Sequence, residues 1–297
     1  MRVLAILIDT GRELLYRKTI LVYFGVVTLV LLSFALLLRT DVVDGAIASM
    51  SVAGLEASSS RGAFRLGEGG QETGLAGLSA QDFVRYVQLG AAFTLYPLAI
   101  LMSIFATASL VPRMLEKGAI DLLLSKPIGR PALFASRYLG ALLVATANLL
   151  YLTCGLGAIL ALKTGVWNGG FIWSGLVMSL YFACLLAFVV LAGVLLRSTT
   201  VSVMLTAVVF FTSLMVRLPH ANQDWPLLIS GRIARFVTVG IVETLFHALP
   251  RTYDFVQAAV SLIRHEGGLQ WGAVFGSALS GAGALGLAII YFSRRDY

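Results

Sequence analysis

Charged residues are scarce in this chain. Only 12% of its 297 residues are Asp, Glu, Lys or Arg, whereas 58% are hydrophobic. A soluble domain carries about twice this share of charge. A water-soluble fold of this length could not bury so much apolar surface, so the composition excludes an ordinary soluble domain. The composition instead predicts a protein that lies largely within a lipid bilayer.

Cysteine is also rare. Cys154 and Cys184 both lie in apolar runs, with neither the spacing of metal ligands nor the pattern of a disulfide framework. We therefore interpret both as small residues buried in the membrane.

Histidine occurs at three positions, all between residues 219 and 270. His265 is followed by Glu266, but no second histidine stands four residues on, so the zinc-protease pattern is absent. Asp224, Glu243 and Glu266 could join the histidines as metal ligands, or all of these residues could be solvated loop residues. No phosphate-binding Gly-x-x-x-x-Gly-Lys sequence occurs. The sequence thus predicts no catalysis, no metal and no cofactor in this chain.

The formal net charge of +7 does not indicate a nucleic-acid-binding protein. The basic residues are distributed among apolar segments and form no continuous stripe.

Six apolar runs are long enough to cross the hydrocarbon core, which needs about 20 residues of helix. They are residues 19–38, 86–111, 138–162, 171–196, 200–218 and 271–292. The first is too long for a cleaved signal peptide and no A-x-A-like site follows it. The predicted fold class is therefore an all-α polytopic membrane protein, with six transmembrane helices in a single domain over residues 1–297.

The distribution of Lys and Arg predicts the orientation. With the N-terminus inside, twelve of the 22 basic residues fall in cytoplasmic segments, where they are about twice as dense as in the outer segments. The twelve are Arg2, Arg12, Arg17, Lys18, Arg113, Lys117, Lys126, Arg130, Arg137, Arg197, Arg294 and Arg295. Both termini are therefore predicted to be cytoplasmic.

We predict a different structure for each of three segments outside the spans. Residues 1–18 form either an amphipathic helix in the membrane interface or a plain extension of the first span. Residues 39–85 form an outer loop, rich in Gly and Ser and mobile over 40–80, that ends where Ser79 and Asp82 resemble a helix-start box. Residues 219–270 form a second outer loop.

In this second loop we expect two short helices that dip into the outer leaflet. One covers residues 236–249. The other begins with Asp254 as a cap and ends at Gly267 and Gly268. The alternative, a seventh crossing, would need an eighth to keep both termini inside.

Small residues recur every four positions in the last span. They are Gly272, Gly276, Ser280, Ala284 and Ala288. We expect them to form a smooth face for close packing with another helix.

Charged residues crowd together between the second and third spans. Arg113 and Glu116 are three residues apart, and Lys117 and Asp121 four apart, so both pairs can support a short helix. Leucines give this helix an apolar surface, and Pro127 ends it. Such a helix suits docking to a protein partner, whereas a plain connecting loop is the alternative.

The stretch "LEKGAIDLLLSKPIGRPALFASRYLGAL", residues 115–142, resembles the signature of ABC-2-type permeases. The matching residues are Glu116, Gly118, Leu123, Leu124, Ser125, Pro127, Gly129 and Arg130. "RELLYRK" at 12–18, "LPRTYDF" at 249–255 and "YFSRRDY" at 291–297 also resemble segments of that family. The resemblance covers most of the chain in order and looks closest to the branch with the nitrous oxide reductase maturation and gliding-motility permeases.

The resemblance implies a permease subunit, which is expected to be an exporter in a bacterial inner or plasma membrane. Two permeases, two copies or two homologues, would pair, and each would dock an ATPase subunit that holds ATP and Mg. Residues 112–131 would be the ATPase-coupling segment. Its expected contact residues are Arg113, Glu116, Lys117, Asp121, Leu123, Leu124, Pro127 and Arg130. The alternatives are an intramembrane hydrolase and a non-transporting scaffold.

Overall fold

The computed structural model describes residues 18–43, 46–52, 55–60, 63–66, 72–73, 79–108, 129–196, 198–221, 240, 243–244, 249–265 and 271–294. Their helices are α2 (Lys18–Leu37), α3 (Ala80–Thr107), α6 (Arg130–Thr164), α7 (Gly169–Leu196), α8 (Thr199–Ala221), α10 (Thr252–Arg264) and α11 (Trp271–Arg294). The strands are β1 (Leu38–Val43), β2 (Ala46–Val52), β3 (Leu55–Ser60), β4 (Ala63–Leu66) and β5 (Glu72–Thr73). The predicted interfacial helix at 1–18 lies outside the described residues except for its last position.

Five described helices are long and apolar enough to cross a membrane. The qualifying segments are Ile20–Leu37, Ala80–Thr107, Pro131–Thr164, Gly169–Leu196 and Val274–Arg294. The prediction of a helical, multi-span chain is confirmed in this form. At the predicted fifth span the backbone of α8 is helical over Thr199–Ala221, but the apolar stretch identified there, Thr199–Ser213, is shorter.

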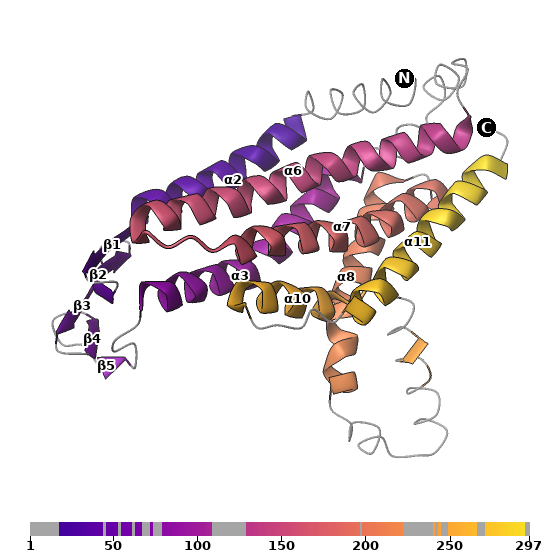
Figure 1. Cartoon of the computed structure of the whole chain (residues 1–297). Coiled ribbons are helices and arrows are strands. Elements are labelled where there is room, and N and C mark those ends of the chain that lie inside the picture. The colour runs from indigo at the N-terminus through magenta and orange to yellow at the C-terminus, as the bar shows by residue number, and fades with distance from the viewer. Residues whose placement is uncertain are drawn as a thin grey trace.

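Helix α7 is the centre of the bundle, and α6, α8, α10 and α11 all pack against it. Its side chains are apolar around the whole circumference, as expected for a helix surrounded by other helices. Tyr181, Leu186 and Ala187 are fully buried although they lie on different sides of the helix. The remaining elements are positioned relative to this helix (Figure 1).

Helix α2 attaches to α3 and α6 through polar contacts within apolar packing. The hydroxyl of Tyr23 lies 2.6 Å from Ser103 Oγ and donates to the carbonyl of Ala99 at 3.2 Å. Further along, Thr28 Oγ1 and the Tyr151 hydroxyl are 3.2 Å apart. The first turns of α2 therefore lie beside the last turns of α3, and α2 runs parallel to α6.

The segment after α2 forms strands rather than the mobile loop that its composition predicts. Strands β1 to β5 pair in sequence order as an antiparallel sheet. Val43 pairs with Ala46, Val52 with Leu55, and Ser60 with Ala63 across two-residue connections. The connections read Asp-Gly, Ala-Gly and Arg-Gly, and of these Asp-Gly is a strong signal for a two-residue hairpin. The all-α prediction is therefore corrected for this segment, whereas the other described elements are helices.

The helix-start box at Ser79 is confirmed. Ser79 is the N-cap of α3, and its hydroxyl accepts from the Asp82 N–H at 3.1 Å and donates to the Asp82 carboxylate at 2.7 Å. The predicted cap at Asp254 is wrong: the N-cap of α10 is Arg251, and Asp254 lies in the first turn. Helix α10 also ends earlier than predicted, at Arg264, and its C-cap His265 has a left-handed φ of 58°.

The bundle has two distinct ends (Figure 1). The strands follow α2 at one end, and the short connection between α6 and α7 lies there too. The first turns of α6 and the last turns of α7 and α11 lie at the other end. Since residues 109–128 join α3 to α6, the predicted coupling segment is attached to this second end.

Candidate functional site

The predicted coupling segment is described only at its C-terminal edge. Residues 109–128 lie outside the described residues. They include seven predicted contact residues: Arg113, Glu116, Lys117, Asp121, Leu123, Leu124 and Pro127. The eighth, Arg130, is the first residue of α6. Gly129 is the N-cap, and its carbonyl accepts from the Leu133 N–H at 3.1 Å. Pro131 stands in the first turn, where proline loses no helical hydrogen bond.

The beginning of α6 is fixed to the end of α11. The rings of Phe134 and Phe292 stack with centroids 5.3 Å apart, and both side chains are fully buried. Leu133 is buried in the same turn. The described residues next to the predicted coupling segment are therefore held against the last turns of α11.

Helix α10 lies beside the first half of α7. At its C-terminal end the carbonyl of Ile263 accepts from Asn168 Nδ2 at 3.0 Å, just before α7 begins. At its N-terminal end Thr252 Oγ1 lies 2.6 Å from the Tyr181 hydroxyl. Asn168 and Tyr181 are about 20 Å apart along α7 at 1.5 Å of rise per residue. The N-terminal end of α10 is therefore level with the middle of a helix that is long enough to span.

Asn168 joins three elements at this end of the bundle. Besides the bond to Ile263, its Nδ2 donates to Gln88 Oε1 on α3 at 2.7 Å. Its Oδ1 accepts from the Gly170 N–H in the first turn of α7 at 3.0 Å. The backbone of α10 approaches closely here, because a Cβ added at Gly170 would lie 2.0 Å from the carbonyl oxygen of Leu262. Glycine at position 170 is thus required by the contact itself.

A polar cluster surrounds the N-terminal end of α10. Thr252 lies within hydrogen-bonding distance of both Tyr181 and Ser213, which brings α7, α8 and α10 together. The Arg251 N–H donates to Ser277 Oγ on α11 at 3.0 Å. Arg251 also forms an ion pair with Asp254 at 3.9 Å, and their side chains are 22% and 9% exposed. Ionisable residues packed beside the middle of a helix that is long enough to span a membrane are candidate functional residues. Sequence reasoning missed this pair because it placed both residues in an outer loop.

Asn148 is a second polar residue inside the bundle. It lies in the middle of α6 and is fully buried. Within the part of the chain that the structure describes, neither its Nδ2 nor its Oδ1 has a hydrogen-bond partner. A buried amide without partners is unfavourable by about 1–3 kcal/mol. This residue is therefore tolerated at a cost to stability.

The small-residue face of α11 differs from the predicted set. The structure places Ala284 and Ala288 in the core, leaves Gly276 and Ser280 half-buried, and exposes Gly272. A Cβ at Gly272 or Gly276 would meet no atom within 4 Å. The close approach is at Gly281, where a Cβ would lie 2.9 Å from Cys184 Cα on α7. The contact face therefore includes Gly281, which the four-residue repeat omits.

Among the residues that the structure describes, no group of three or more His, Cys, Asp or Glu could hold a metal ion. Of the three histidines, His265 ends α10, the backbone of His220 is part of α8, and His247 lies outside the described residues. Asp224 and Glu266 also lie outside them.

No family model matches the chain, and no curated protein matches it.

Proposed function

We propose that this chain is the membrane-spanning permease subunit of an ATP-binding cassette exporter of the ABC-2 type, driven by a separate ATPase subunit. The observation that carries the proposal is the sequence of residues 116–130, with its Glu-x-Gly and Leu-Leu-Ser-x-Pro-x-Gly-Arg elements. Its position supports the proposal, because it joins two of the helices that are long enough to span, Ala80–Thr107 and Pro131–Thr164.

In this proposal the coupling segment 112–131 docks in a groove of the ATPase. ATP and Mg bind to the ATPase, and closure of the ATPase pair displaces the segment. The displacement reaches α6 directly and α11 through the contact between Phe134 and Phe292. It reaches α7 at the contact between Thr153 of α6 and Gly175 of α7. A Cβ added at Gly175 would lie only 2.8 Å from the Thr153 side chain. Since α7 contacts most other helices, movement there changes the whole bundle.

The permease acts as a pair of two copies or two homologues, in a bacterial inner or plasma membrane, with both termini in the cytoplasm. The ion pair of Arg251 and Asp254, beside the middle of α7, supports this function, since transporters use such groups in their pathways. In this proposal the ATPase hydrolyses ATP, and the permease pair forms the transport pathway.

The test is to look for an ABC ATPase gene beside the gene of this chain, and to express the chain with and without that ATPase. The purified chain alone is expected not to hydrolyse ATP. The co-expressed proteins are expected to purify as a complex that does. ATP hydrolysis by the lone chain, free of contaminating ATPases, contradicts the proposal and favours an enzyme. Failure of the two proteins to associate in the membrane favours a scaffold.

A further inference from the structure

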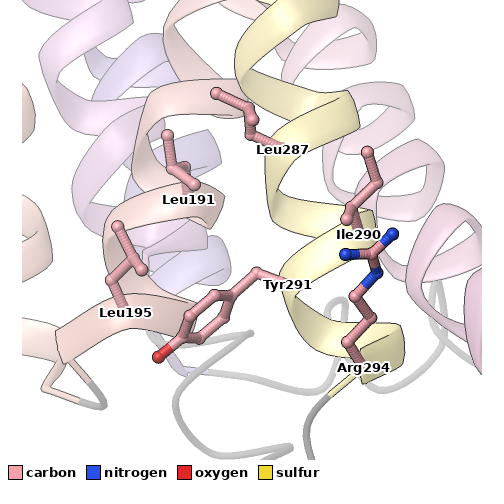
Figure 2. Close-up of a pocket in the computed structure, with 6 residues that line it drawn as sticks. All are labelled: Leu191, Leu195, Leu287, Ile290, Tyr291 and Arg294. Atoms are coloured by element: carbon pink, nitrogen blue, oxygen red, sulfur yellow. The ribbon is translucent and has the colours of Figure 1, made fainter.

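A groove lies between the last turns of α7 and α11, with a volume of about 520 Å³. Its lining residues are Leu191 and Leu195 on α7 and Leu287, Ile290, Tyr291 and Arg294 on α11. Figure 2 shows the ring of Tyr291 extending toward Leu195, and Ile290 and Arg294 one above the other along α11. The groove is within the size range of pockets that bind small molecules.

The groove opens on the outer surface of the bundle. Leu195, Leu287 and Ile290 are 46%, 61% and 50% exposed, although each belongs to a helix that is long and apolar enough to span a membrane. Leucine and isoleucine so exposed on such helices face hydrocarbon. An apolar groove on this surface is filled by lipid unless a protein covers it.

The groove has a polar end. Arg294 is the last residue of α11 and is exposed, so it lies where the helix leaves the hydrocarbon. Leu287 is seven residues earlier, about 10 Å deeper along the helix. Tyr291 stands between them, at the depth where tyrosines anchor helices to the interface. Arg294 supplies a cation at this end of the groove, and none of the lining residues that the structure describes is acidic.

We propose that this groove binds one anionic phospholipid. An acyl chain lies against Leu191, Leu195 and Leu287, and the headgroup phosphate accepts hydrogen bonds from the guanidinium of Arg294. An arginine fork matches the geometry of a phosphate group. Along α11 the lining residues follow the order aliphatic Leu287, aromatic Tyr291 and cationic Arg294, which matches the order of chain, interface and headgroup in a phospholipid.

A second copy of the chain is a poorer occupant. A symmetric contact through this face would bring the same surface of both copies together. It would then place two arginines near each other, and like charges in an interface oppose association. The binding of lipid at this groove does not depend on the ATPase or on transport.

The test uses a fluorescent reporter at the groove, Leu287→Trp, in the purified full chain. Residue 287 is 61% exposed, so the substitution leaves the core intact. The variant is placed in phosphatidylcholine vesicles containing a small fraction of brominated phosphatidylglycerol or brominated phosphatidylcholine, which quench tryptophan on contact. The emission of the parent chain is subtracted. We expect brominated phosphatidylglycerol to quench the reporter at about a fivefold lower fraction, the ratio given by one cation near the membrane surface.

Two arginine variants in the reporter background complete the test. Arg294→Gln is expected to remove the fivefold preference. Arg85→Gln is expected to keep it, because Arg85 pairs with Asp82 at 3.7 Å near the start of α3, away from the groove. Equal quenching by both lipids before any arginine is changed overturns the proposal, as does a preference that survives Arg294→Gln.

Two further results also overturn it. Relief of quenching by millimolar inorganic phosphate would mean that the groove binds a free anion. Absence of quenching by either lipid, with crosslinking of Leu287→Cys between two chains, would mean that a second copy covers the groove.

Discussion

Gly281 of α11 lies directly against Cys184 of α7. A Cβ at position 281 would be 2.9 Å from Cys184 Cα and 3.1 Å from its Cβ. The contact is between backbones, so no flexible side chain can move aside. Gly281 therefore sets how closely the last span approaches the central helix.

Replacing this glycine should separate α11 from α7. Gly281→Ala is expected to destabilise the purified protein by about 1–3 kcal/mol, the usual effect of overpacking. The measurement is thermal unfolding in detergent. Gly276→Ala is the matched control on the same helix, since a Cβ there meets nothing within 4 Å. Equal unfolding temperatures for the two variants would show that Gly281 is not the contact that holds α11.

Replacement of Gly170 is also expected to destabilise the protein, but through a different contact. Alanine there would place Cβ 2.0 Å from the Leu262 carbonyl oxygen and push α10 away from α7. Gly170→Ala should therefore lower the unfolding temperature and make the loop before α10 easier to cleave with protease. Gly90→Ala, on α3 with open space around its Cβ, serves as the control. Unchanged protease sensitivity in Gly170→Ala would contradict the close packing of α10.

Asn148 and Asn168 are both buried, but we expect their replacement to change the stability of the protein in opposite directions. Asn148→Leu removes an amide for which the described structure offers no partner, so stability should rise by about 1–3 kcal/mol. Asn168→Leu removes bonds to Gln88, Ile263 and Gly170, so stability should fall by a similar amount. Thermal unfolding of the two variants side by side checks both signs. A fall for Asn148→Leu would mean that the amide has a partner.

The orientation of the chain is tested with single cysteines. In a background without reactive native thiols, Gly69→Cys should react with an impermeant thiol reagent in intact cells. Ser293→Cys should react only after the membrane is opened, because the charge distribution places the end of α11 inside. The opposite labelling pattern would invert the predicted topology.

Hydropathy predicted the long helices well because length and apolarity are local properties of the chain. The segment 171–196 is an example: α7 covers Gly169–Leu196. The start of α3 was also predictable, because Ser79 and Asp82 carry the capping chemistry in their own side chains.

The strands after α2 were missed although a local signal existed. Composition rich in Gly and Ser indicated a mobile loop, but the glycines stand second in each two-residue connection between strands. The position of glycine in a two-residue connection, and not the overall glycine content, is the feature that predicts paired strands.

The contact face of α11 was missed for a geometric reason. Residues spaced by four advance 400° around a helix, so a strict repeat drifts by about 40° per step and leaves the face. The observed buried positions Ser277, Gly281, Ala284 and Ala288 alternate steps of four and three, and so stay on one side. The ion pair of Arg251 with Asp254 was beyond prediction, because its depth depends on how α10 packs on α7.

Central to the proposed function is that the ATPase binds the surface formed by residues 113–124. Glu116→Lys should leave membrane insertion unchanged, since a pair such as Arg113 with Glu116 on an exposed helix contributes only about 0.2–0.5 kcal/mol. At an interface the reversed charge should weaken association on the order of a hundredfold.

The decisive measurement is co-purification of the ATPase with Glu116→Lys, compared with Glu72→Lys, a charge reversal in β5 at the opposite end of the bundle. Both variants should reach the membrane at the level of the parent. We expect Glu116→Lys to lose the ATPase and Glu72→Lys to retain it. Retention of the ATPase and of function by both variants would contradict it.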